Sequence, residues 1–355
     1  MKKKWFALFI AFWSVGSALD VTWTHVLPNL SSTSSQPVIS QFSDGSAVAI
    51  WTESAGLALK AASFNPSTKA WGTSVTIATS TVAITNYSLK TDRSSVALAI
   101  WLQSSALGTA GEPRAAQYTK STDTWASVPT LWNVDALTPF ELLSVGFLGN
   151  NLALFSATQE FSVESLVFWE RFRFYNYNTQ ALQADRILDT LHNQFYSANI
   201  GKTGSSQAIT VYIQCAVNTD ADYSVAAALL TPPTTVNTLT TISAVGVNNT
   251  ISLAVGSNLN GQAVCAWVQA GDVYASYLTS FTSNTWASPT RLTTSGTVTT
   301  APLCAMDDQR NGVVGWLDTQ LGVQAFQVSF FNSSSLSWSS NANVSLTTSS
   351  ASSPA

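Results

Sequence analysis

The sequence predicts an all-β protein, specifically a six-bladed β-propeller of four-stranded antiparallel blades. Three observations lead to this fold class. A strand-like motif ending in an aromatic residue recurs along the chain, further short strand-like runs surround each copy, and clear helical periodicity is missing. The anchor aromatics are Trp51, Trp101, Phe155, Tyr212, Trp267 and Trp316, at spacings of 50, 54, 57, 55 and 49 residues.

The anchor strands are apolar at successive positions, as in Val48-Ala49-Ile50-Trp51. Continuous apolar character is typical of a strand that is buried on both faces, whereas alternation marks a strand with one wet face. A propeller blade packs against a neighbour on either side, which supplies that environment. We therefore expect Trp267→Ala to cost roughly 3–5 kcal/mol, as for other buried large aromatics.

The rest of each repeat supplies the other strands of a blade. An apolar strand precedes each anchor, and an aromatic-ended run such as Ala115-Ala116-Gln117-Tyr118 follows it. A polar turn then leads to a Trp-led run, for example residues 125–131. The pairs Asp44-Gly45 and Asn260-Gly261 predict tight turns with positive φ. The third and fourth copies of the repeat match this pattern less closely.

The repeats resemble those of secreted bacterial β-propeller proteins, in which a Gly-x-Ala-x-Ala-x-Trp strand precedes an aromatic-ended strand and a Trp-x-x-Pro strand. The turn Phe42-Ser43-Asp44-Gly45 is similar to the Ser-Pro-Asp-Gly turn of TolB-type propellers, without its proline. The Asp-boxes and arginine triad of sialidase-like propellers have no matched copy here, nor does the Arg-Glu-Trp set of fucose lectins. The resemblance therefore implies an architecture and no functional residues.

The N-terminus predicts export. Three lysines at positions 2–4 precede an apolar stretch over residues 5–15, and Gly16 and Ala18 suit a cleavage site, so residues 1–18 read as a signal peptide. We expect residues 19–346 to form a single propeller domain and residues 347–355 a disordered Ser-rich tail. A strand from residues 20–31 would close the ring in the last blade; the alternative closing strand is residues 338–346. The product would be a periplasmic, cell-surface or secreted monomer without a transmembrane helix.

The composition of the chain limits the kinds of ligand and cofactor that it could bind. Without the leader lysines the chain has 12 basic and 19 acidic residues, a formal charge of −7, which argues against nucleic acid. Cys215, Cys265 and Cys304 match no metal motif, and we expect buried thiols, although the last two lie on neighbouring repeats and could approach each other. No catalytic motif, metal site or cofactor site is predicted, so the sequence leans against an enzyme.

The third repeat is rich in charged and aromatic residues. If residues 166–177 form a strand, Trp169, Arg171, Arg173 and Tyr175 share one face. Aromatic rings beside guanidinium groups suit sugar faces, acidic ligands or a protein partner, so these four residues are the predicted ligand-binding site. The alternative is that the arginines pair with Glu164 or Glu170 and serve packing alone.

The favoured functional interpretation is an exported, non-enzymatic binding or interaction protein of unknown ligand, with a protein or a glycan as partner. A carbohydrate-binding or carbohydrate-active propeller, lectin-like or glycosidase-like, is the first alternative. A structural scaffold of the cell envelope is the second.

Overall fold

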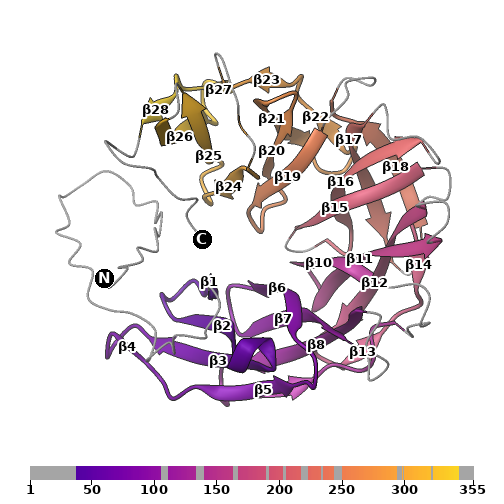
Figure 1. Cartoon of the computed structure of the whole chain (residues 1–355), viewed down its shortest axis with the longest axis vertical. Coiled ribbons are helices and arrows are strands. Elements are labelled where there is room, and N and C mark those ends of the chain that lie inside the picture. Colours follow the sequence, from indigo (N-terminus) through magenta and orange to yellow (C-terminus); the bar gives the residue numbers. More distant parts are fainter. Residues whose placement is uncertain are drawn as a thin grey trace.

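The computed structural model describes most of the chain from Pro37 onward. Its strands form six antiparallel sheets arranged as blades around a common centre (Figure 1). This confirms the predicted six-bladed β-propeller. The described residues are 37–104, 111–132, 140–162, 167–188, 192–202, 205–216, 223–232, 235–243, 250–293, 298, 300–320 and 323–343. None of the helical segments within these ranges has the length and apolarity needed to cross a membrane.

Each blade is built from one continuous stretch of chain, with its first strand nearest the centre (Figure 1). The first strands are β1 (Val38–Gln41), β6 (Ile84–Thr91), β10 (Phe140–Phe147), β15 (His192–Gly201), β19 (Thr250–Ser257) and β24 (Leu303–Met306). The second strands are β2 (Ala47–Glu53), β7 (Val96–Ser104), β11 (Leu152–Ser162), β16 (Ala208–Ala216), β20 (Ala263–Gln269) and β25 (Gly312–Gln320).

The outer half of each blade is more varied. The third strands are β3 (Ala58–Asn65), β8 (Gly111–Thr119), β12 (Val167–Asn176), β17 (Ser224–Thr231), β21 (Asp272–Ser280) and β26 (Val323–Asn332). The fourth strands are β4 (Ala70–Trp71), β9 (Thr124–Ser127), β13 (Ala181–Leu182), β18 (Thr235–Thr241), β22 (Thr285–Trp286) and β27 (Ser337–Trp338). In four blades a further short strand also pairs with the third strand: β5 (Val75–Thr79), β14 (Arg186–Ile187), β23 (Thr290–Arg291) and β28 (Ala342–Asn343). A short 3-10 turn, η1 (Ser54–Gly56), joins β2 to β3.

The six anchor aromatics all lie on second strands and are buried, as predicted. Every residue of β20 is buried, which fits its continuous apolar sequence. The turn from β1 to β2 differs from the expected two-residue hairpin, because Gln41 pairs with Ala47 and residues 42–46 form the loop. Gly45 does take the positive φ that the turn requires, at 86°.

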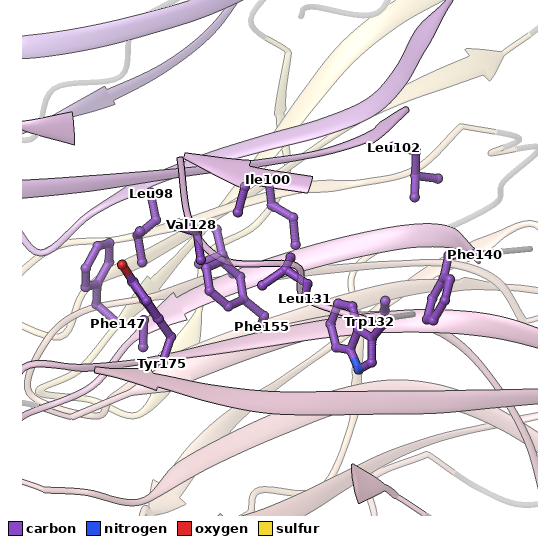
Figure 2. Packing of buried hydrophobic residues seen from close by; sticks show 14 of the residues in the cluster. Leu98, Ile100, Leu102, Val128, Leu131, Trp132, Phe140, Phe147, Phe155 and Tyr175 are labelled. Carbon is purple, nitrogen blue, oxygen red and sulfur yellow. The ribbon is translucent and has the colours of Figure 1, made fainter. Parts of the chain in front are cut away.

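Five of the six blade interfaces contain a hydrophobic cluster to which both neighbouring blades contribute. Figure 2 shows the cluster between the second and third blades, where Leu98 and Ile100 meet Phe155 and Tyr175. Each anchor aromatic of blades two to six packs toward the preceding blade. First strands also approach closely: a Cβ on Gly256 of β19 would lie 2.7 Å from backbone atoms of Ala305 on β24, so a glycine is required there.

The two ends of the described chain belong to the first blade and the sixth, so the seam of the ring lies between these two blades (Figure 1). Within the described residues the apolar side chains at this seam form two separate clusters, one around Trp51 in the first blade and one around Phe326 in the sixth. The fourth strand of the sixth sheet is β27, from its own repeat, as in the alternative closure by residues 338–346. The predicted signal peptide, the closing segment 20–31 and the tail 347–355 lie outside the described residues.

None of the three cysteines, all of which lie among the described residues, forms a disulfide, and Cys215 and Cys265 are buried. Burial raises the pKa of the Cys265 thiol well above its usual value, so this group stays protonated near neutral pH. These two residues therefore serve as small apolar side chains of the core, as predicted. Cys304, on β24, is partly buried.

Candidate functional site

The third blade carries the predicted ligand-binding residues. Trp169, Arg171, Arg173 and Tyr175 alternate along β12, so they share one face of the sheet as predicted. Tyr175 belongs to the cluster between the second and third blades, which places this face toward the second blade (Figure 2). Phe172 belongs to the cluster shared with the fourth blade, on the opposite face.

Arg171 is held within the third blade by an acid that also binds the segment preceding this blade. Its guanidinium forms an ion pair with Asp185, and its NH1 donates a 2.7 Å hydrogen bond to Gln159 Oε1. Trp132 Nε1 donates a 2.7 Å hydrogen bond to the same Asp185 carboxylate. Burial, followed by the charge of Arg173, lowers the pKa of Arg171, yet an arginine remains protonated in proteins. Within the described residues the acidic partner of Arg171 is thus Asp185. Glu170 accepts a hydrogen bond from Thr158, and Glu164 lies outside the described residues.

The other side chains of this face are also engaged by protein groups. Arg173 Nε donates a 2.9 Å hydrogen bond to the carbonyl oxygen of Gln183, and its NH1 donates to the carbonyl of Leu131. The Tyr175 hydroxyl donates a 2.9 Å hydrogen bond to Gln117 Oε1 on β8 of the second blade. These contacts connect the third blade to the second blade and to the segment between them. A ligand-binding role for this face stays a prediction.

A different polar feature recurs on the anchor strands. The residue two positions after the anchor lies on the same face of the strand, and in three blades it accepts a hydrogen bond from the anchor indole. These bonds are Trp51 Nε1 to Glu53 Oε1 at 3.0 Å, Trp101 Nε1 to Gln103 Oε1 at 3.4 Å and Trp267 Nε1 to Gln269 Oε1 at 3.1 Å. Each acceptor satisfies a buried N–H group that would otherwise lose its hydrogen bond to water.

The sixth blade carries the same arrangement with a shorter acid. Asp318 follows Trp316 by two positions on β25, but its side chain is one methylene shorter than that of glutamate or glutamine. Trp316 is 1% exposed, and within the described part of the chain its Nε1 has no hydrogen-bond partner. Its cluster includes Leu292 of the preceding blade, so the face that Trp316 shares with Asp318 looks toward the fifth blade. A buried indole donor therefore remains unsatisfied on the same face as a carboxylate.

A cavity of about 590 Å³ opens at this interface, within the range of roughly 300–1,000 Å³ that is typical of small-molecule sites. The fifth blade contributes β23 and the residue after it, and the sixth blade contributes β25, β26 and the segment from β27 onward. The lining residues are Thr290, Arg291, Leu292, Asp318, Gln327, Trp338, Ser339, Ser340 and Asn341. Gln327 is the ladder partner of Trp316, so the unsatisfied indole belongs to a strand residue flanked by two lining residues, Asp318 and Gln327.

Both blades contribute charged side chains to the surroundings of the cavity. Arg291 NH2 donates a 2.9 Å hydrogen bond to Asp272 Oδ1, and Thr293 Oγ1 donates a 2.7 Å hydrogen bond to the same oxygen. The carboxylate of Asp272 thus contacts both Arg291 and Thr293 within the fifth blade. Asp318, 3% exposed, faces the cavity from the sixth blade. Asn341 Nδ2 donates a 2.6 Å hydrogen bond to the carbonyl of Leu292 and joins the two blades at the cavity edge.

This lining combines an aromatic ring, amides, hydroxyls, a guanidinium and a carboxylate, which suits a small hydroxyl-rich ligand. Within the described residues, no group of three or more His, Cys, Asp or Glu side chains could hold a metal ion. Sequence reasoning missed Asp318. The signal that could have found it is the repeated Trp-x-Glu or Trp-x-Gln pattern, which becomes Trp-x-Asp in the sixth repeat.

Comparison with known proteins supports the fold. An α-L-arabinofuranosidase of Fusarium graminearum, solved with an iminosugar inhibitor, is similar with a TM-score of 0.55 at 11% identity, over 84% of this chain and 92% of that one. An α-L-arabinanase of Penicillium chrysogenum complexed with arabinobiose has a TM-score of 0.51 at 11% identity, over 85% and 94%. A Dyadobacter fermentans protein of unknown function has a TM-score of 0.51 at 10% identity, over 84% and 94%. No family model and no curated protein matches the sequence.

These comparisons contradict the functional interpretation that the sequence favoured. We expected a non-enzymatic binding or interaction protein, whereas the characterised neighbours above are described as glycosidases. The carbohydrate alternative is better supported. The sequence-based preference is wrong because it relied on the lack of contiguous motifs, while a propeller assembles a site from single side chains on separate blades. At 10–11% identity the likeness itself shows the fold alone.

Proposed function

We propose that this protein is a carbohydrate-active β-propeller whose saccharide ligand or substrate binds in the cavity between the fifth and sixth blades. The observation that carries the proposal is the cavity lining, in which the Trp338 ring, the Asp318 carboxylate and the amides of Gln327 and Asn341 surround about 590 Å³. Sugars offer apolar ring faces that pack on aromatic rings and hydroxyl groups that pair with carboxylates and amides. The glycosidases among the comparison structures favour the same ligand class.

Hydrolysis is the second candidate, because an α-L-arabinofuranosidase and an α-L-arabinanase share this fold. Cleavage of a glycosidic bond generally needs two carboxyl groups about 5–9.5 Å apart. Asp318 is the carboxylate that lines the cavity, and Asp272 is held by Arg291 and Thr293. The cavity thus supplies sugar recognition more directly than a catalytic pair.

A glycan array and a hydrolysis screen with arabinan and arabinobiose test this proposal. We expect the wild-type protein to bind at least one class of saccharide. Asp318→Asn should weaken this affinity by about tenfold, as expected for the loss of a hydrogen bond to a charged group. The matched control is Asp308→Asn, which removes a 63% exposed carboxylate from a turn of the same blade and should leave binding unchanged. A wild-type protein that neither binds nor cleaves any saccharide would overturn the proposal.

We also propose that this activity takes place outside the cytoplasm, because the first 18 residues have the layout of a signal peptide. Mass spectrometry of the protein recovered from its native host tests this point. An N-terminus at Leu19 supports export, and an intact leader on intracellular protein contradicts it.

A further inference from the structure

The chain that leads from the outer edge of one blade to the next contributes an aliphatic side chain to every shared cluster. These residues are Ile77, Leu131, Leu188, Ile242 and Leu292, in the order of the five interfaces. Each lies in or against the cluster that holds the anchor aromatic of the following blade; these anchors are Trp101, Phe155, Tyr212, Trp267 and Trp316. The connecting segment is therefore a regular part of the blade interface.

The position of this aliphatic residue is fixed by the short strand before it. Leu188 directly follows β14, and Leu292 directly follows β23. The backbone N–H of Leu188 donates a 2.9 Å hydrogen bond to the carbonyl of Glu170, and that of Leu292 donates a 2.8 Å bond to the carbonyl of Val273. Both residues thus extend the pairing with the third strand by one step, and their side chains join the cluster shared with the next blade.

The sixth blade repeats this arrangement up to its last described residue. The strand β28 pairs with β26, and Asn343 lies opposite Gln327. One step further along β26 is Phe326, which belongs to the apolar cluster on the seam face of this blade. The residue that follows β28 is Val344, which lies outside the described residues. The repeat therefore supplies an aliphatic residue at the point where the other blades have one.

We propose that Val344 closes the ring by packing between the Phe326 cluster of the sixth blade and the Trp51 cluster of the first. Its backbone N–H donates to the carbonyl of Phe326, as Leu292 donates to its own third strand. Its side chain packs with Trp51, as Leu292 shares a cluster with Trp316. The two separate clusters thereby become a sixth shared cluster, and the occupant of the seam is the C-terminal segment of the same chain.

The sheet order favours this segment over residues 20–31. The sixth sheet already contains outer strands from its own repeat, β27 and β28, so it needs no strand from the N-terminus. Because β28 ends one residue before Val344, the chain needs no connecting loop to reach the seam. The facing clusters are apolar, which suits a valine side chain. Their buried members are Val313, Phe326 and Val328 in the sixth blade and Ala49, Trp51 and Ala62 in the first.

Val344→Ala in the full-length chain tests the proposal. We expect the thermal midpoint to fall by about 2–4 °C, because the interface loses two buried methyl groups. Native-state hydrogen exchange should become about tenfold faster for the amides of β2 and β25, and should stay unchanged for those of β11 and β16. Ser345→Ala is the matched control, since the next residue of an extended chain points the opposite way, and it should change neither readout. Leu188→Ala is the reference variant, which should accelerate exchange in β11 and β16 instead.

A second substitution identifies the partner across the seam. If Val344 packs against Trp51, the midpoint shifts of Val344→Ala and Trp51→Phe are not additive in the double variant, because the two residues share a contact. Additive shifts would place Val344 away from the first blade and overturn the proposal.

Two other occupants of the seam give different results. If the N-terminal segment fills it, deletion of residues 20–31 lowers the midpoint and accelerates exchange in β2 and β25, whereas Val344→Ala has no effect. If a second copy of the chain fills it, exchange at the seam slows as the protein concentration rises. Either result overturns the proposal. Saccharide binding takes no part in these measurements, so their outcome is independent of the proposed function.

Discussion

A buried indole is apolar except for its N–H group, which needs a hydrogen-bond acceptor. In this propeller the acceptor comes from the same strand. The acceptor lies two residues after the tryptophan, so one face of the strand carries both groups. Glu53, Gln103 and Gln269 have the length to reach the indole nitrogen. Asp318 is one methylene group shorter, and this difference distinguishes the sixth blade from the first, second and fifth, the other blades with a tryptophan anchor.

This dependence on length predicts that Gln269→Asp destabilises the protein. The shorter acid would leave Trp267 Nε1 unsatisfied in a fully buried position, at a cost of about 1–3 kcal/mol in the free energy of unfolding. Urea denaturation measures the change. Gln309→Asp, at an exposed turn position, is the control and should stay within about 0.5 kcal/mol of wild type. Equal stability of the two variants would show that the Trp267–Gln269 bond contributes nothing.

At the scale of single elements, β12 shows how a charge-rich strand can serve packing. Arg171 pairs with the Asp185 carboxylate within the third blade, and Arg173 donates to the Leu131 carbonyl in the segment between the second and third blades. A guanidinium offers five donors in a fixed plane, which suits such a multiple contact. The polar turns between blades act similarly, with Lys120 of the second blade paired to Asp44 of the first.

We predict that Arg171→Ala lowers stability and leaves sugar binding unchanged. The side chains of Arg171 and Asp185 are 23% and 26% exposed, so loss of the charged hydrogen bonds should cost about 1–3 kcal/mol. Thermal unfolding and the glycan array together measure the two effects. Arg186→Ala, which removes an exposed arginine from the neighbouring strand, is the control. Weakened sugar binding with unchanged stability would instead support the binding site predicted from the sequence.

The pairing of Asp44 with Lys120 predicts a pH dependence. The hydrogen bond from Lys120 lowers the pKa of Asp44 from 3.8 to about 2. A group whose pKa is lower in the folded state stabilises the fold above its unfolded value, and this contribution is lost as the pH falls from about 4 to 2. Asp44→Asn should therefore have a slightly lower thermal midpoint than wild type at pH 6, and the gap should close toward pH 2. Because Asp44 is half exposed, high salt should shrink the gap as well.

At the scale of the whole molecule, the six interfaces are not equivalent. Five contain a shared apolar cluster, whereas the described residues at the seam between the sixth and first blades form two separate clusters. An ion pair from Arg93 of the second blade to Asp308 of the sixth spans the first blade on the side of the turns. The exposed fraction of Asp308 is 63%, so this pair adds little to the closure of the ring.

We expect the ring to open first at this seam. Native-state hydrogen exchange should report faster exchange for the amides of β1 and β24 than for those of β10 and β15, because β1 and β24 belong to the seam with no shared apolar cluster among described residues. The amides of β19 are an internal reference, since this first strand lies between two shared clusters. Uniform protection of all the first strands would show that the seam is as stable as the other interfaces.

The architecture could be predicted from the sequence because each blade repeats a local pattern. Trp51 and Trp267 mark second strands by their apolar surroundings and spacing, and the alternation along β12 follows from strand geometry. The cavity could not be predicted in the same way. Its lining joins Arg291 to Trp338 and Asp318, which are brought together by the packing of β23 against the outer strands of the next blade. The Trp316–Asp318 pair can be read from the sequence, but its meaning depends on which acceptor can reach the indole.

Aspartate and glutamate codons differ only at the third base. A single nucleotide substitution therefore exchanges the acid that satisfies the indole of its own strand for the acid that leaves this buried N–H group without an acceptor. In a ring whose first and sixth repeats already carry Trp-x-Glu and Trp-x-Asp, the number of satisfied anchor indoles can change by point mutation without any rearrangement of the fold. Related propellers with this repeat should accordingly differ in the blades whose anchor indole has an acceptor, and so in stability.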